Sequence, residues 1–230
     1  MARRKIIFVI VEGPSDDQAL GVLLDRFFDQ NEVYVQVMHE DITTQRGADS
    51  SNIISKIQKV VKEYIDNNPY TKKDIQKIIH LVDMDGAYIP NDFVVYDPTA
   101  VKPLYFETEI RTKNKAGIEQ RNQQKGAILY KISNTREIWT IPYQVFYMSV
   151  NLDHVLYNKL NSGDEEKEAD SFNFAKQYKD CVPKFIQFLC ESNFSVHMGY
   201  KESWEYIRKE LHSLERHTNF GLCFLPDEPK

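Results

Sequence analysis

Along the first third of the chain, strand-like runs of apolar residues alternate with segments whose apolar residues have helical spacing. Residues 5–11 and 78–82 are short, continuous runs rich in Ile and Val, which are typical of strands buried on both faces of a parallel sheet. A third run, 33–38, alternates Val with other residues. Residues 15–28 and 53–65 carry apolar side chains at helical spacing instead. These patterns predict a β-α-β-α-β unit with parallel strands and right-handed crossovers.

The pattern loosens after the third strand and then recovers. We expect an insertion over about 87–136, with short strands at 93–96 and 104–106 and a polar helix at 117–131. A fourth strand at 144–150 and a helix capped by Asn151 and ending near Leu160 complete the alternation. The fold class is therefore α/β, with a parallel sheet flanked by helices and an insertion after the third strand.

The last part of the chain differs in composition. An acidic segment, 163–170, precedes two helical patterns, 174–191 (interrupted at Pro183) and 202–217. We divide the chain into a domain over 1–160 and a helical C-terminal extension over 161–230.

Charge and cysteine content narrow the functional classes. The net charge of -5 over 230 residues disfavours a uniformly basic nucleic-acid coat. The three cysteines, Cys181, Cys190 and Cys223, include no CxxC pair, which disfavours a zinc site and favours a reducing compartment. The apolar run that ends at Glu12 is too short for a signal peptide, and no stretch is long enough for a membrane span. These features predict a cytoplasmic protein without a membrane partner.

Acidic residues stand directly after two of the expected strands. Glu12 follows the first strand, and Asp83 and Asp85 follow the third. In open α/β sheets, ligands bind beyond the carboxyl ends of the strands, so these carboxylates are expected to converge. Crowded carboxylates repel each other, and a hard cation such as Mg²⁺ relieves that repulsion. On this view Glu12→Gln or Asp83→Asn should leave the stability of the metal-free protein unchanged or higher. The alternative is that these acids only cap the following helices.

These motifs resemble those of the TOPRIM domain, and most closely the OLD (overcoming-lysogenization-defect) nuclease branch. The matching residues are Glu12 after the first strand, Asp83 and Asp85 after the third, and Asp16, over roughly residues 5–160. The resemblance implies a TOPRIM-like Rossmannoid fold. It also implies a nuclease that cleaves DNA or RNA with Mg²⁺ or Mn²⁺. Glu12, Asp83 and Asp85 would be its catalytic residues, and those three with Asp16 its metal ligands. Asp16 is equally explained as an acid favoured at a helix N-terminus.

Two alternatives remain open. Asp83-Met84-Asp85-Gly86 also resembles the first motif of haloacid-dehalogenase-like phosphatases, although that fold needs a later strand ending in an acidic pair, for which Asp164 and Asp170 are the nearest candidates. The chain could also be a non-catalytic TOPRIM-like binding or regulatory module within a larger complex.

A cluster of basic residues lies in the insertion. Residues 102–136 hold eight basic residues against three acids. This local excess predicts phosphate contacts from Arg111, Lys113, Lys115, Arg121 and Lys125, with stacking of bases on nearby aromatic residues. A solvated helix face with aromatic residues in the core explains the same pattern equally well. The histidines are scattered, and the spacing of His212 and His217 does not fit one helical face.

The chain contains no Gly-x-x-x-x-Gly-Lys-Ser/Thr phosphate-binding loop. Because OLD-type nucleases are commonly fused to an ABC-type ATPase, the resemblance implies a separate ATPase partner and a role in anti-phage defence. The oligomeric state is open, with a homodimer as one alternative.

Overall fold

The computed structural model describes residues 5–29, 33–39 and 42–225. The chain divides into two compact units that are interleaved along the sequence. The first comprises Met1–Val82, Gln124–Val145 and Asp164–Asp180, and the second comprises Asp83–Gln123, Phe146–Gly163 and Cys181–Lys230. A boundary between the two units falls between Gly163 and Asp164. The division into a domain over 1–160 and an extension over 161–230 stays a prediction.

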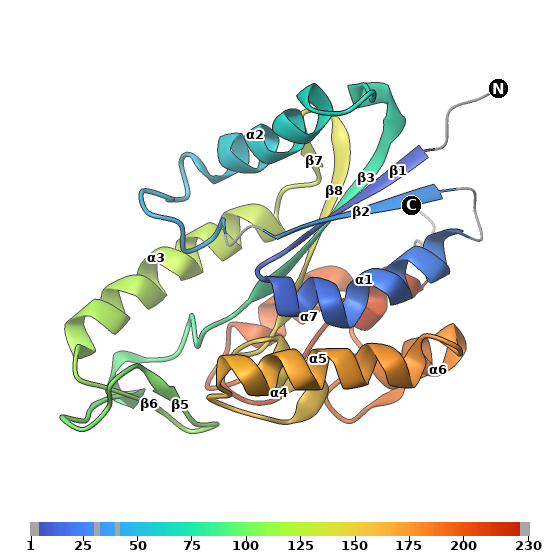
Figure 1. Ribbon diagram of the computed structural model, residues 1–230. Helices are drawn as coiled ribbons and strands as arrows, with labels where there is room; N and C mark the ends of the chain where they lie inside the picture. Colours follow the sequence, from blue (N-terminus) through green and yellow to red (C-terminus); the bar gives the residue numbers. More distant parts are fainter. Residues whose placement is uncertain (1–4, 30–32, 40–41, 226–230) are drawn as a thin grey trace. The chain divides into compact units, whose positions relative to one another are not determined.

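The first unit is built on a five-stranded sheet (Figure 1). Its strand order is β2-β1-β3-β8-β7, with β1 at Lys5–Val11, β2 at Val33–His39, β3 at Ile75–Asp83, β7 at Glu137–Ile138 and β8 at Ile141–Met148. Strand β1 pairs in parallel with both β2 and β3, as the sequence predicted. Strands β7 and β8 form an antiparallel hairpin, so the sheet is mixed rather than wholly parallel. The two-residue strand β7 was missed because it is too short for a periodic signal.

Helices cover both faces of this sheet. They are α1 (Pro14–Asp29), α2 (Ile53–Asp66) and the second part of α3 (Lys115–Ser133), with a short 3-10 turn at Lys72–Asp74. Helix α5 (Asp164–Tyr178) packs on α1. Right-handed crossovers on either side of β1 place α1 and α2 on opposite faces (Figure 1). The acidic segment after residue 163 is not a linker, because it forms the start of α5, which packs along α1.

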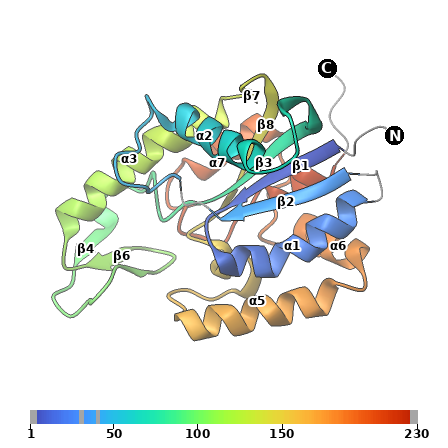
Figure 2. The ribbon, with the colours of Figure 1, turned by 45° about the horizontal axis from the view of Figure 1, so that its top comes forward.

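The second unit contains a small sheet and several short helices (Figure 2). The sheet has the order β4-β6-β5, with β4 at Val94–Tyr96, β5 at Leu104–Tyr105 and β6 at Ile110–Thr112. The helices are α4 (Leu152–Tyr157), α6 (Val182–Glu191) and α7 (Tyr200–Ile207), with 3-10 turns at Asn91–Phe93 and Phe220–Phe224. The small core of the insertion consists of Ile89, Val94, Ile110, Ile118, Val150 and Leu214.

Two helices are shorter than the sequence predicted. Helix α4 ends at Tyr157 because Asn158 adopts a left-handed conformation with φ 57°. The helix expected over 202–217 ends at Ile207, and Glu210 has φ 48°. No helix in the described ranges is long and apolar enough to cross a membrane.

Candidate functional site

The two strands that precede the acidic motifs are parallel neighbours. Strand β1 pairs with β3 through a register that sets Ile10 opposite His80. Glu12 directly follows β1, and Asp83 is the last residue of β3. The predicted pairing of these strands is therefore confirmed, and both acidic motifs follow strands that end at the same edge of the sheet.

Glu12 is paired with a buried lysine. Its Oε1 accepts a hydrogen bond from the Thr43 hydroxyl at 3.2 Å and lies 3.8 Å from the Nζ of Lys125. The Lys125 side chain is 1% exposed and that of Glu12 is 11% exposed. The positive charge of Lys125 therefore offsets the negative charge of Glu12 in the interior. Lys125 is therefore buried, and the phosphate contact predicted for it stays a prediction.

The burial of Lys125 follows from its position on α3. The buried residues of this helix recur at helical spacing, and they include Ile118, Asn122, Lys125, Leu129 and Ile132. Two of these five are polar. A lysine on the apolar stripe of a helix is thus the sequence signal that could have identified an internal partner for an acid.

Asp16 makes a local contact at the start of α1. Its Oδ2 accepts the backbone N–H of Gly13 at 2.9 Å. This is one half of a capping box, in which the third residue of a helix bonds back to the residue before its first turn. The contact supports the capping explanation for Asp16, and its role as a metal ligand stays a prediction.

The second acidic motif forms a tight turn with a fixed backbone. The N–H groups of Met84 and Asp85 donate to the carbonyls of Met148 and Val150 at 2.9 and 2.8 Å. Asp83 accepts the N–H of Leu152, the first residue of α4, through Oδ1 at 3.2 Å. These contacts hold the start of the turn against the segment that leads from β8 into α4.

Two successive residues of this turn have left-handed backbone conformations. Asp85 has φ 49° and Gly86 has φ 70°. A Cβ on Gly86 would lie 2.7 Å from Ile110 and 2.9 Å from Leu214, both in the core of the insertion. Glycine is therefore required at residue 86, and the acidic turn is packed directly against this small core.

A divalent cation is consistent with the donor chemistry of these motifs. Within the residues that the structure describes, no group of three or more His, Cys, Asp or Glu side chains is arranged to hold a metal ion. Mg²⁺ seldom requires such a cage, since one or two carboxylates usually hold it while water and substrate phosphates complete its shell. The two aspartates of the turn after β3 supply oxygen ligands of that kind.

Most of the predicted phosphate-binding residues have partners inside the protein. Arg111 pairs with Glu109 at 2.5 Å and lies over the ring of Phe106, and Lys115 lies 3.7 Å from Glu119. Lys113 is exposed. These pairs offset the positive charge of Arg111 and Lys115. Nucleic-acid binding by Arg111, Lys113 and Lys115 stays a prediction.

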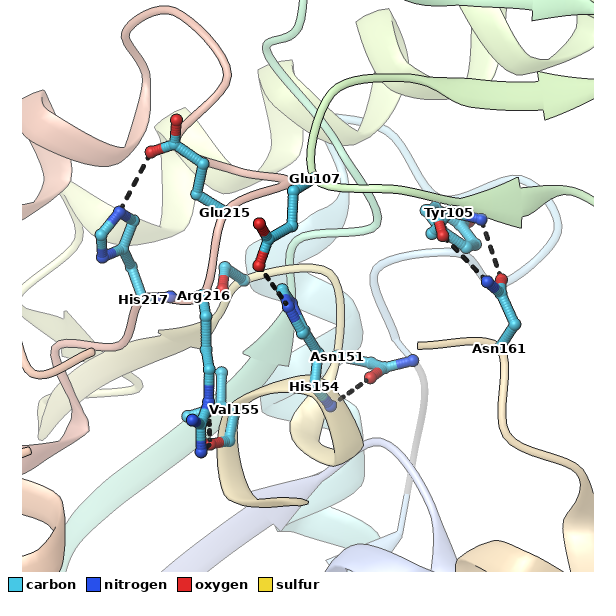
Figure 3. Close-up of polar contacts among 10 residues, drawn as sticks. Tyr105, Glu107, Asn151, His154, Val155, Asn161, Glu215, Arg216 and His217 are labelled. Carbon is cyan, nitrogen blue, oxygen red and sulfur yellow. Dashed lines mark hydrogen bonds and ion pairs between the residues drawn. The ribbon is translucent and has the colours of Figure 1, made fainter. Parts of the chain in front are cut away.

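A network of histidines and glutamates was not expected from the sequence (Figure 3). Because the chain turns after α7, His212 and His217 both contact the ring of Tyr206, with ring centroids 4.0 and 5.2 Å away. His217 lies 3.2 Å from Glu215. Burial lowers the pKa of His217, and the hydrogen bond to Glu215 opposes that shift. Spacing on an ideal helix could not predict this cluster.

A second part of this network surrounds α4 (Figure 3). The Nε2 of His154 lies 3.7 Å from Glu107, and the guanidinium of Arg216 donates two hydrogen bonds to the carbonyl of Val155. Burial lowers the pKa of His154, and the negative charge of Glu107 partly offsets that effect. His154 is therefore buried within the structure.

His80 is fully buried inside β3. Its Nδ1 lies 2.8 Å from the hydroxyl of Tyr143, and burial together with the nearby charge of Lys125 lowers its pKa to about 3. A neutral histidine in this position is a component of the core.

Comparison of the chain with protein-family models, with curated proteins and with solved structures finds no match.

Proposed function

We propose that the protein is a divalent-metal-dependent nuclease of the TOPRIM type that cleaves phosphodiester bonds in DNA or RNA. The observation that carries this proposal is the parallel pairing of β1 with β3, whose ends bear Glu12 and the Asp83-Met84-Asp85-Gly86 turn. Three features support the proposal: the carboxylate oxygens of these acids, the order of the strands, and the hydrogen bonds that hold the backbone of the acidic turn.

Each residue has a distinct role in this proposal. Asp83 and Asp85 would hold Mg²⁺ or Mn²⁺. When bound, the metal supplies Lewis-acid stabilisation of the charge that builds up on the phosphate oxygens. Glu12 would accept the proton of the attacking water or complete the ligand set. Lys125 would lower the electrostatic cost of a negative charge on Glu12 when a phosphate binds.

A non-catalytic TOPRIM-like binding module is the second candidate. It is favoured by the pairing of Glu12 with Lys125 and by the lack, in the described ranges, of a three-residue metal cluster. The phosphatase alternative is weakened. The acids at 164 and 170 belong to helix α5, whereas that fold requires them to follow a strand.

The test is a cleavage and metal-binding assay on the full chain. Purified protein is incubated with plasmid, single-stranded DNA and tRNA, with Mg²⁺, Mn²⁺ or EDTA, and Mn²⁺ binding is measured by calorimetry in parallel. We expect cleavage that requires metal and is lost in Asp83→Asn and Asp85→Asn, together with loss of Mn²⁺ binding. Metal binding without cleavage would favour the binding module, and equal Mn²⁺ binding by both variants would reject the site.

From the resemblance to OLD-type nucleases, we further propose that an ABC-type ATPase is a separate partner of this protein and that the protein acts in anti-phage defence. A nuclease that acts with such a partner should cleave faster when the ATPase and ATP are added. An unchanged rate would argue for an independent enzyme.

A further inference from the structure

Arg121 is half-buried and contacts the acidic turn. Its Nη2 donates to the backbone carbonyl of Asp85 at 2.7 Å, and its Nη1 donates to the hydroxyl of Tyr105 at 2.6 Å. The same guanidinium donates two further hydrogen bonds to the side chain of Asn122. A guanidinium that makes four hydrogen bonds within the protein is already occupied and is poorly suited to follow a phosphate backbone.

Tyr105, the second hydrogen-bond partner of Arg121, is also held in place. Tyr105 lies in β5, and its N–H and carbonyl bond to the side chain of Asn161 at 2.8 Å each (Figure 3). Arg121 therefore connects the carbonyl of Asp85 to a tyrosine whose own backbone is held in place. The planar fork of an arginine can serve both acceptors at once, whereas the single ammonium of a lysine cannot hold both in the same geometry.

We propose that Arg121 is a positioning residue of the metal site, and that the insertion after β3 acts as a brace for the acidic turn. This inference depends on the proposed function, because it assumes that Asp83 and Asp85 bind the metal. Asp85 has a left-handed backbone conformation that side-chain-bearing residues seldom adopt, so its direction depends on the groups that hold its peptide. Removal of the bond from Arg121 allows the turn to relax and moves the Asp85 carboxylate away from its ligand position.

Mn²⁺ titration of the full-length chain tests this role. Groups that orient metal ligands typically contribute about 10- to 100-fold to metal affinity, so Arg121→Met should weaken Mn²⁺ binding at least about tenfold. Arg121→Lys, which keeps the charge, should also weaken it, and Tyr105→Phe should do so to a smaller extent. The control is Lys102→Met, which removes the same charge from an exposed position in the insertion and should leave Mn²⁺ affinity unchanged.

The direction of the change separates positioning from simple electrostatics. Loss of a positive charge beside a cation site would by itself tighten Mn²⁺ binding, so tighter binding by Arg121→Met would overturn the proposal. Unchanged Mn²⁺ affinity in Arg121→Lys and Tyr105→Phe would also overturn it. Arg121→Lys keeps a long charged side chain and Tyr105→Phe keeps the aromatic ring, so both are expected to fold. Circular dichroism checks the folding of every variant.

Nucleic-acid binding provides the second readout. For a single-stranded oligonucleotide, the slope of log affinity against log salt concentration should be the same in Arg121→Met, Arg121→Lys, Tyr105→Phe and the wild type. A phosphate contact made by Arg121 would instead lower the slope of Arg121→Met by about 0.7–0.9 and reject the positioning role.

Asp85→Asn distinguishes failure of this inference from failure of the proposed function. If Asp85→Asn weakens Mn²⁺ binding and the Arg121 variants do not, only the positioning role is rejected. If Asp83→Asn and Asp85→Asn bind Mn²⁺ like the wild type, the metal site and the inference are rejected together.

Discussion

Substitution of Glu12 tests whether its carboxylate is compensated by a lysine or crowded by other acids. Lys125 and Glu12 lie 3.8 Å apart with side-chain exposures of 1% and 11%. At that separation, two unit charges attract by about 4 kcal/mol at an effective dielectric constant of about 20. Loss of one member of a buried pair typically costs about 3–5 kcal/mol, because the remaining charge loses that attraction in the interior.

We therefore expect Glu12→Gln to lower the free energy of unfolding by about 3 kcal/mol, near the lower end of that range. The glutamine can still accept the hydroxyl of Thr43, which reduces the loss. Lys125→Met should be destabilising for the same reason. The double variant should be clearly less destabilised than the sum of the two, with a coupling of about 2–3 kcal/mol.

The assay is urea unfolding followed by circular dichroism, at low salt and in 1 M NaCl. Because the pair is buried, the coupling should persist at high salt. A matched cycle with Lys115→Met and Glu119→Gln provides the control. Those residues form a more exposed pair on the same helix and should couple by about 0.3–0.5 kcal/mol at most, with loss of that coupling in salt.

Crowded carboxylates predict the opposite result. If repulsion from Asp83 and Asp85 dominated, Glu12→Gln would keep or raise stability, which is what the sequence alone suggested. A stable Glu12→Gln variant with no coupling to Lys125→Met would refute the reasoning from the buried pair.

Two further predictions concern the acidic turn and β3. Gly86→Ala should destabilise the protein by about 2 kcal/mol, because the new Cβ adds left-handed backbone strain and lies less than 3 Å from Ile110 and Leu214. The control is Gly163→Ala, which should change stability by about 0.5 kcal/mol or less because nothing lies within 4 Å of the added Cβ. Equal effects of the two substitutions in urea unfolding would disprove the packing argument. The folded pKa of His80 is lowered to about 3, so its contribution to stability is present above the unfolded pKa of about 6.5 and is lost as the pH falls toward 3. By pH 5 this loss amounts to about 2 kcal/mol, and His80→Gln should show a correspondingly smaller decrease between pH 7.5 and pH 5.

The strands that carry the acidic motifs were predictable because their environment is uniform. Residues 6–11 are all buried, and a strand that is buried along its length requires the continuous Ile and Val run that the sequence displays. The same signal predicted β3 and its pairing with β1. Short elements such as β6 and β7 bury too few residues to produce a recognisable pattern.

The C-terminal part shows why apolar spacing is an incomplete guide. Trp204, Ile207 and Leu214 recur at helical spacing, and all three are buried. The helix nevertheless ends at Ile207, and Leu214 reaches the core of the insertion from an irregular segment. Periodicity correctly indicated which residues are buried, but a chain that turns can bury the same residues without remaining helical.

The basic residues of the insertion were the hardest to interpret from the sequence. A lysine or arginine is usually solvated, so an excess of them suggests a surface for phosphate. Here Lys125 is paired with Glu12, and Arg121 holds the carbonyl of Asp85. Since these residues are four positions apart on α3, they belong to one face of the helix. A local charge count cannot distinguish an inward-facing charge from an outward-facing one.

This use of positive charge has a consequence for nucleic-acid binding. Arg121 and Lys125 make internal contacts, and Arg111 and Lys115 each pair with a glutamate. These are four of the eight basic residues in 102–136, so fewer charges are left to release counterions from a phosphate backbone. We therefore expect the isolated chain to bind nucleic acid weakly, with a shallow salt dependence. A partner subunit that supplies phosphate contacts would steepen that dependence. A steep slope for the isolated chain would instead indicate a basic surface elsewhere on the protein.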